Sequence, residues 1–333
     1  MVKTICIRGF SHAYELSEPT DSPTVLVFVH GWLLSRAYWQ PVIERLSSRF
    51  QCLSYDLRGF GESQPGSAEA KSVASMERTI ASEAPQEVTT VPRVASPPCS
   101  PYATVDPTSS LLPTESFAYS PAAYAQDLTS LLHNLNITRA WLIGHSLGGA
   151  IALWAADQAP GTILGVICIN AGGGIYIKKE FEKFRAAGQQ IIKFRPQWLA
   201  SIPLLDLVLT GALAQMSVTQ PLTRLWGKQR LLDLLSAHPE AAIGALLEST
   251  TETEVHLLPQ VVARLQQPVH FIAGVNDTVM EPKYVRHLAS FHASFECCGS
   301  NVTHIANCGH LAMLEQPETV ADEIWRILAM HQA

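Results

Sequence analysis

The sequence Gly144-His145-Ser146-Leu147-Gly148-Gly149 decides the fold. The apolar run before it, at 140–143, predicts a buried strand, and the apolar run after it predicts a buried helix. A strand that turns into a helix within one residue leaves no room for side chains around the turn. The glycines at 144 and 148 meet that need, and Ser146 is left at the tip in a strained backbone conformation with its hydroxyl exposed.

The pattern Gly-x-Ser-x-Gly at a strand-to-helix turn is typical of a nucleophile elbow, and on these residues the chain resembles the α/β-hydrolases. A glycine-rich turn also occurs as a phosphate cradle or as a plain tight turn, so the motif is interpreted together with its flanks and partners. The resemblance implies an α/β fold with a mostly parallel eight-stranded sheet, flanking helices and a helical cap subdomain. It also implies that Ser146 is the catalytic nucleophile.

Two residues near the C-terminus match the family's other catalytic positions. A strand is predicted at 268–273, and Asp277 follows it where relatives keep the acid of the triad. A last strand is predicted at 301–306, and His310 follows it in the position of the family's catalytic histidine. The resulting order of serine, acid and histidine along the chain is the one that this fold uses.

Two other positions were candidates for the acid. Some relatives carry it after the strand predicted at 163–169, but this chain has Asn170 there, and an amide cannot hold the charge. Asp56 begins a segment that resembles the D-x-R-G-x-G-x-S segment common in the family, where we expect an architectural role: Asp56 and Arg58 fix the loop near the site. Asp277 is therefore the predicted acid.

The resemblance also implies an oxyanion hole. The β-branched run at 24–29 predicts a strand covered on both faces, and it ends in His30-Gly31-Trp32. By position, the backbone N–H groups of Trp32 and Leu147 would form the hole. Amides oriented in advance toward a developing oxyanion each lower the barrier by about 3 kcal/mol. A simple strand-ending turn is the alternative interpretation of His30-Gly31.

The chain is predicted to fold as a core with two insertions. The core comprises residues 1–171 and 268–333. Residues 172–267 show helical spacing and almost no strand signal, which predicts a helical cap over the site. Residues 64–116 are rich in Ser, Pro, Thr, Ala and Glu without a sustained period, which predicts a disordered insertion within the core.

Apolar residues of the cap are the candidates for a substrate pocket. They are Trp198, Leu205, Leu209 and Trp226. The alternative is that these side chains pack the cap against the core. The apolar stretch at 198–216 is also a candidate for contact with a membrane surface, although it lacks the lysine- and arginine-rich polar face usual for interfacial helices.

Composition narrows the class of protein. The net charge of −6 argues against nucleic-acid binding, which normally requires a basic stripe. No signal peptide and no membrane-spanning stretch of about 18 apolar residues is expected. The 7 cysteines are odd in number and scattered, which favours buried reduced thiols and a cytoplasmic location. The implied chemistry requires no metal and no organic cofactor.

We therefore predict a serine hydrolase that cleaves a small or lipophilic carboxylic ester, or a lactone, through an acyl-enzyme. Epoxide hydrolases and haloalkane dehalogenases of this fold carry Asp at the elbow, so Ser146 counts against both. Hydrolases of C–C bonds in meta-cleavage products, which commonly have Trp after the histidine and Asn before the serine, remain an alternative despite Leu311 and His145. Cofactor-free haloperoxidases or perhydrolases, and a ligand sensor with slow turnover, are further alternatives.

Overall fold

A computed structural model describes residues 1–64, 118–175, 177–195, 203–297 and 301–331. Within these ranges, the side chains of 203–207 and 296–297 are not described. The insertion predicted at 64–116 therefore lies outside the described residues from position 65 onward, and Trp198 lies outside them as well.

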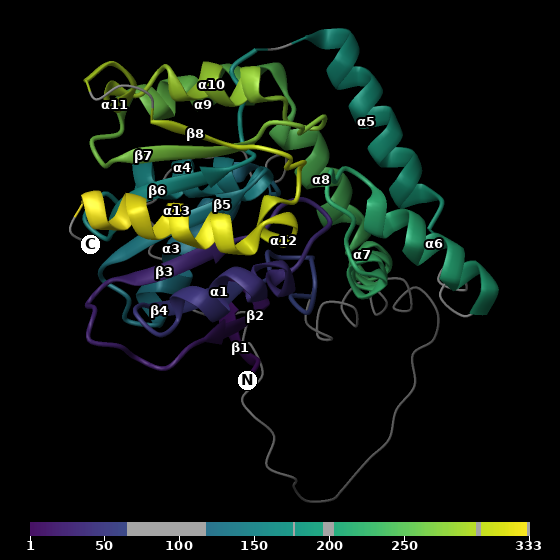
Figure 1. Cartoon of the computed structure of the whole chain (residues 1–333), viewed down its shortest axis with the longest axis horizontal. Helices are drawn as coiled ribbons and strands as arrows, with labels where there is room; N and C mark the ends of the chain where they lie inside the picture. The colour runs from purple at the N-terminus through teal and green to yellow at the C-terminus, as the bar shows by residue number, and fades with distance from the viewer. Residues whose placement is uncertain (65–117, 176, 196–202, 298–300, 332–333) are drawn as a thin grey trace, which may run out of the picture.

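An eight-stranded sheet forms the centre of the molecule, with the strand order β1-β2-β4-β3-β5-β6-β7-β8 (Figure 1). Strands β1, β2 and β4 pair antiparallel, and every pairing from β4 through β3 to β8 is parallel. This confirms the predicted mostly parallel sheet and the hairpin at its edge. The strands are β1 (Lys3–Ile7), β2 (Phe10–Leu16), β3 (Val25–Val29), β4 (Gln51–Tyr55), β5 (Ala140–His145), β6 (Ile163–Ile169), β7 (Val269–Gly274) and β8 (Val302–Ile305).

Helices cover both faces of the sheet (Figure 1). On one face lie α1 (Gln40–Leu46), preceded by the 3-10 turn η1 (Arg36–Trp39), and α12 (Ala312–Glu315) and α13 (Pro317–Met330). On the other face lie α3 (Pro121–Asn134), α4 (Leu147–Gln158), α9 (Glu252–Arg264) and α10 (Pro282–Ala289). The short helix α11 (Ala293–Cys297) follows α10.

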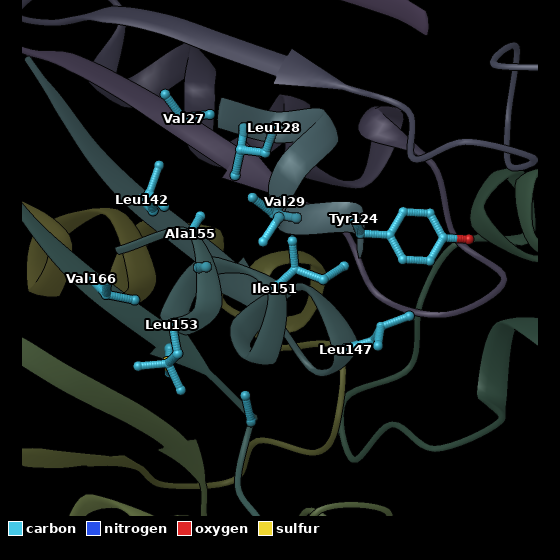
Figure 2. Packing of buried hydrophobic residues seen from close by; sticks show 14 of the residues in the cluster. Val27, Val29, Tyr124, Leu128, Leu142, Leu147, Ile151, Leu153, Ala155 and Val166 are labelled. Atoms are coloured by element: carbon cyan, nitrogen blue, oxygen red, sulfur yellow. The ribbon is translucent and has the colours of Figure 1, made fainter. Parts of the chain in front are cut away.

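Strand β3 shows why a continuous apolar run was needed. Its residues Val25, Val27 and Val29 pack into the core beneath α3 and α4, while Leu26 and Phe28 pack into the core beneath α1 and α13. Successive side chains of a strand point to opposite faces, so a strand covered on both sides must be apolar throughout. Figure 2 shows the first of these cores, in which side chains of β3, β5 and β6 meet those of α3 and α4.

The segment after β6 is helical, as predicted for 172–267. It contains α5 (Lys178–Lys193), α6 (Pro203–Gln215), α7 (Arg224–Ser236), α8 (Pro239–Ser249) and α9. Helices α5 to α8 lie together beside the sheet (Figure 1), whereas α9 packs on the core helix α4. The division of the chain into core and cap stays a prediction.

A buried carboxyl group joins α7 to the loop after β3. Asp233 Oδ2 accepts a hydrogen bond from Ser35 Oγ at 3.1 Å, and Oδ1 accepts one from Gln229 Nε2 at 3.0 Å. Burial raises the pKa of this carboxyl from 3.8 to about 7. The folded protein therefore binds a proton at Asp233 over a pH range in which the unfolded chain does not.

We expect Asp233→Asn to change how stability depends on pH. Because the folded-state pKa is raised, the stability contributed by the protonated group is complete below pH 3.8 and is lost as the pH rises through about 7. Asparagine has no proton to lose, so the melting temperature of the variant minus that of the wild type should increase between pH 5 and pH 8. The free-energy change is at most about 4 kcal/mol, at about 1.4 kcal/mol per pKa unit. The melting temperatures of both proteins are measured by calorimetry. A difference between them that stays constant from pH 5 to pH 8 would contradict the raised pKa of Asp233.

The cysteines follow the prediction only in part. Cys52, Cys168 and Cys308 are free and buried, and burial raises the pKa of each thiol. Cys6 is disulfide-bonded, so the prediction of reduced thiols is wrong at that position. Its side chain lies on the exposed side of the edge strand β1, outside the core to which the reasoning about buried thiols applied. The cytoplasmic location stays a prediction.

Among the helices of the described ranges, none has both the length and the apolar character needed to cross a bilayer.

Candidate active site

Ser146 occupies a sharp turn between β5 and α4. Its backbone has φ 52° and ψ −119°, a conformation that non-glycine residues rarely adopt. A Cβ atom at Gly144 would lie 2.2 Å from Gly148 O, and one at Gly148 would lie 2.2 Å from Val29 O. Only glycine fits at either position, which confirms the interpretation of the motif as a crowded strand-to-helix turn.

His310 and Asp277 form a hydrogen-bonded pair. His310 Nδ1 lies 2.8 Å from Asp277 Oδ2, and the two residues are 9% and 3% exposed. The other carboxylate oxygen, Oδ1, accepts hydrogen bonds from the backbone N–H groups of Val279 and Met280 at 2.8 and 2.9 Å. Both oxygens of Asp277 are therefore engaged, and the carboxylate has a fixed orientation toward the imidazole.

Two side chains from neighbouring strands hold the backbone of His310. His145 Nε2 lies 2.8 Å from His310 O, and the two imidazole rings are 4.8 Å apart. Asn170 Nδ2 donates to Gly309 O at 2.7 Å and to His310 O at 2.8 Å, while Asn170 Oδ1 accepts from Gly274 N at 2.8 Å. The sequence predicted only that Asn170 is not the acid; in the structure its side chain ties the end of β7 and the loop after β8 to the end of β6.

We expect Asn170→Ala to lower both stability and any turnover that depends on His310. The change removes three hydrogen bonds at a fully buried site and leaves two carbonyls and one N–H without this partner. A cost of about 2–4 kcal/mol in unfolding free energy follows from such losses. The matched control is Asn136→Ala, since exposed Asn136 has φ 55° against 47° for Asn170. Equal destabilisation of the two variants in urea titrations would show that backbone conformation alone explains the effect.

The two predicted oxyanion-hole residues lie at the cavity that Ser146 faces. Trp32 and Leu147 both line it. Within the described residues, neither backbone N–H donates a hydrogen bond, which leaves both available. The Trp32 indole donates to Ala242 O at 2.8 Å and so anchors the loop after β3 to α8.

The loops near the site have the architecture expected for the Asp56 segment. Asp56 is fully buried, forms an ion pair with Arg36, and accepts hydrogen bonds from the backbone N–H groups of Arg36 and Glu62 at 2.7 and 2.9 Å. His30 Nε2 accepts a hydrogen bond from Leu57 N at 2.9 Å. Burial lowers the pKa of His30, so this residue is a neutral structural imidazole that joins the loops after β3 and β4.

A cavity of about 270 Å³ lies in front of Ser146. Its walls come from the elbow, from residues 172–175, and from α5, α8, α9 and α10. Most of the lining side chains are apolar, and among them Phe184 is 45% exposed at the surface. The lining residues include Phe181 and Phe184 of α5, Leu246 of α8, Val255 and Leu258 of α9, and Met280 and Tyr284.

None of the four residues predicted to form a substrate pocket is among the described residues that line this cavity. Trp226 packs against Tyr38, with ring centroids 5.6 Å apart, and it borders the core beneath α1 and α13 rather than this cavity. Leu209 is half-buried on α6 and is not among the lining residues either. The contact with Tyr38 agrees with the alternative role of packing for Trp226, and the role of Leu209 stays a prediction. Leu205 belongs to α6, but its side chain lies outside the described residues, as does Trp198.

The geometry brings the three predicted catalytic residues to the carboxyl ends of β5, β7 and β8. Within the described residues, no hydrogen bond joins Ser146 Oγ to His310, so the direct contact between nucleophile and base remains part of the proposal below. Catalytic hydrogen bonds are often long without substrate and tighten when it binds.

Comparison with known proteins decides the family. The family model for the alpha/beta hydrolase fold matches residues 24–317. The chain belongs to the α/β-hydrolase family. Its sheet order, its strand-to-helix elbow and its His310–Asp277 pair agree with that membership.

Individual relatives of this α/β-hydrolase are distant. An uncharacterized protein of Mycobacterium tuberculosis is 24% identical over 333 residues, which cover 97% of this chain and 79% of that protein. The 2-succinyl-6-hydroxy-2,4-cyclohexadiene-1-carboxylate synthase of an Enterobacter species is 28% identical over 208 residues, or 62% of this chain and 73% of the synthase. The solved structure of a thermophilic esterase from Thermogutta terrifontis covers 99% of this chain, with 98% of its own chain matched, at 21% identity and a TM-score of 0.66.

Proposed function

We propose that this α/β-hydrolase is a serine hydrolase that cleaves a small or lipophilic carboxylic ester or a lactone. The observation that carries the proposal is the position of Ser146, at the tip of a strained elbow and on the wall of a mostly apolar cavity. The His310–Asp277 pair at the adjacent strand ends supports it.

In the proposed mechanism, His310 is the base that activates Ser146. A serine hydroxyl is a poor nucleophile at neutral pH, so a proton acceptor must remove its proton as attack begins. Asp277 holds the Nδ1–H of His310, which leaves Nε2 free to accept the serine proton and later to return it to the leaving alcohol. The serine oxygen attacks the ester carbonyl, the alcohol leaves, and water then releases the acid from the acyl-enzyme.

The oxyanion is assigned to the backbone N–H groups of Trp32 and Leu147. Neither N–H donates to another group of the described residues, which supports this role because an occupied N–H would not be available to the developing charge. The Leu147 N–H is also one of the first donors of α4, and such groups at a helix start have no acceptor within the helix.

The apolar cavity favours an ester with a hydrocarbon acyl or alcohol portion. Burial of hydrocarbon contributes about 25 cal/mol per Å², so aromatic and aliphatic walls select lipophilic substrates. A cavity of about 270 Å³ suits a short to medium chain or a single ring.

Labelling with a fluorophosphonate probe, followed by mass spectrometry, tests the nucleophile directly. We expect a single adduct on Ser146 and none in Ser146→Ala. A panel of p-nitrophenyl esters, lactones and ring-cleavage diones then tests the substrate class. Turnover of the diones alone would replace the ester assignment with C–C bond hydrolysis, and ligand binding without turnover of any of them would indicate a sensor.

A further inference from the structure

A nearly buried carboxyl group lies on the wall of the mostly apolar cavity. Glu254, in the first turn of α9, lines the cavity and is only 9% exposed. Its Oε1 accepts a hydrogen bond from Trp154 Nε1 at 2.6 Å. Its Oε2 has no hydrogen-bond partner within the described residues, and it is not among the fully enclosed polar atoms. One carboxylate oxygen is therefore left for a ligand in the cavity.

No cationic side chain of the described ranges faces this carboxylate across the cavity. The side chains that line the cavity include no lysine, arginine or histidine within the described residues, and the other charged one is Glu180, at its exposed edge. Burial raises the pKa of Glu254, and the nearby carboxyl group of Glu248 in α8 raises it further. The cavity as a whole is acidic.

Two arginines, one on α5 and one on α9, are engaged elsewhere. Arg185 of α5 donates from Nε to Thr250 Oγ1 at 2.7 Å and also donates to Thr250 O. Arg264 of α9 forms a bidentate pair with Asp157, with both hydrogen bonds at 2.6 Å. Neither arginine is therefore available as an ion-pair partner of Glu254.

We propose that the cavity takes esters that carry a protonated amine, and that Glu254 recognises the ammonium group. A buried carboxylate without a cation is costly, and an ammonium ion supplies both the missing hydrogen-bond donor and the opposite charge. A hydroxyl would supply only the donor. The rings of Trp32, Phe181 and Tyr284 line the same cavity, and aromatic faces attract cations. A carboxylate-bearing ligand would be repelled.

Binding of three matched ligands to the wild-type protein tests the proposal without any chemistry. Hexylammonium, 1-hexanol and hexanoate differ only in their polar end, and calorimetric titration at pH 7.5 compares their affinities. We expect hexylammonium to bind at least tenfold more tightly than hexanol, and hexanoate to bind most weakly. Equal affinity of the amine and the alcohol would overturn the proposal.

Glu254→Gln identifies the residue responsible. Glutamine has nearly the same shape and keeps an oxygen that can accept from Trp154 Nε1, so the variant should melt near the wild-type temperature. It should bind hexylammonium about tenfold more weakly and hexanol unchanged. The matched control Glu180→Gln, at an exposed carboxylate of the same cavity, should change either affinity by less than threefold. An unchanged amine preference in Glu254→Gln would overturn the assignment, and so would an equal loss in both variants.

That the amine-bearing ligand is an ester rests on the proposed function. Turnover assays distinguish the amine-recognition site from the hydrolase activity. Ethyl 6-aminohexanoate and ethyl heptanoate are matched in length, and the wild type should favour the first in kcat/KM while Glu254→Gln should not. If neither ester is cleaved and Ser146 is not labelled, but the amine still binds tightly, the proposed function fails and the recognition site stands. If both are cleaved equally well, and the amine binds like the alcohol, the recognition site fails and the hydrolase stands.

Discussion

Ser146→Ala is expected to reduce ester turnover by roughly 10⁵-fold or more, since removal of a serine nucleophile costs about this much in serine hydrolases. The substitution removes one oxygen atom at the turn between β5 and α4 and leaves the neighbouring glycines in place. Alanine can occupy the same backbone conformation at a similar cost, so the melting temperature should change little. The measurement is kcat with p-nitrophenyl butyrate.

The matched control is Ser249→Ala. Ser249 also lines the cavity, but its hydroxyl donates weakly to Leu246 O, at 3.4 Å, within α8. This variant should keep kcat within about threefold of the wild type. Wild-type turnover in Ser146→Ala, or an equal loss in Ser249→Ala, would end the assignment of the nucleophile.

Asp277→Asn should lower kcat by about 10⁴-fold, the loss seen when the same change is made in a serine protease triad. The structure gives the reason. Asp277 Oδ1 accepts from two backbone N–H groups, so the oxygen of an asparagine must stay on that side. Its NH₂ group then faces His310 Nδ1 and donates to it, which moves the imidazole proton to Nε2. In that tautomer, Nε2 is unable to accept the proton of Ser146.

Asp157→Asn is the control for this prediction, because Asp157 pairs with Arg264 near the surface, away from the triad. It should keep kcat close to the wild-type value. The fluorophosphonate reaction of Asp277→Asn should be slowed to a similar extent as turnover, since both need an activated serine. If Asp277→Asn retains most of the activity, another carboxylate is the acid.

The features that depend on local sequence could be predicted. Gly144 is required by contacts within a few residues of the turn, although Gly148 is required by the Val29 carbonyl of the neighbouring strand. The packing of alternate β3 side chains into the two cores follows from the unbroken apolar run of this strand. The positions of Asp277 and His310 came from resemblance to a family, and their hydrogen bond agrees with it. These are the parts of the fold in which sequence pattern and structure are directly related.

The cavity wall could not be predicted in the same way. The choice of Trp226 rested on its apolar character, which does not distinguish a residue facing a ligand from one packed on Tyr38. The amphipathic pattern of α5, with Phe181 and Phe184 on one side, was the available signal, because its apolar face had to cover something. The role of Asn170 depends on loops more than 100 residues away along the chain, and no local pattern reports such contacts.

The hydrogen bonds to the carbonyl of His310 have a consequence for how ligands enter and leave the cavity. Since His145 and Asn170 both hold this carbonyl from the ends of adjacent parallel strands, the backbone that carries the base moves with the sheet. Helix α5, which carries the partly exposed Phe184, is the wall of the cavity that we expect to open. We expect substrate entry and product exit to depend on movement of that helix, while the proposed base, His310, keeps its position from one cycle to the next.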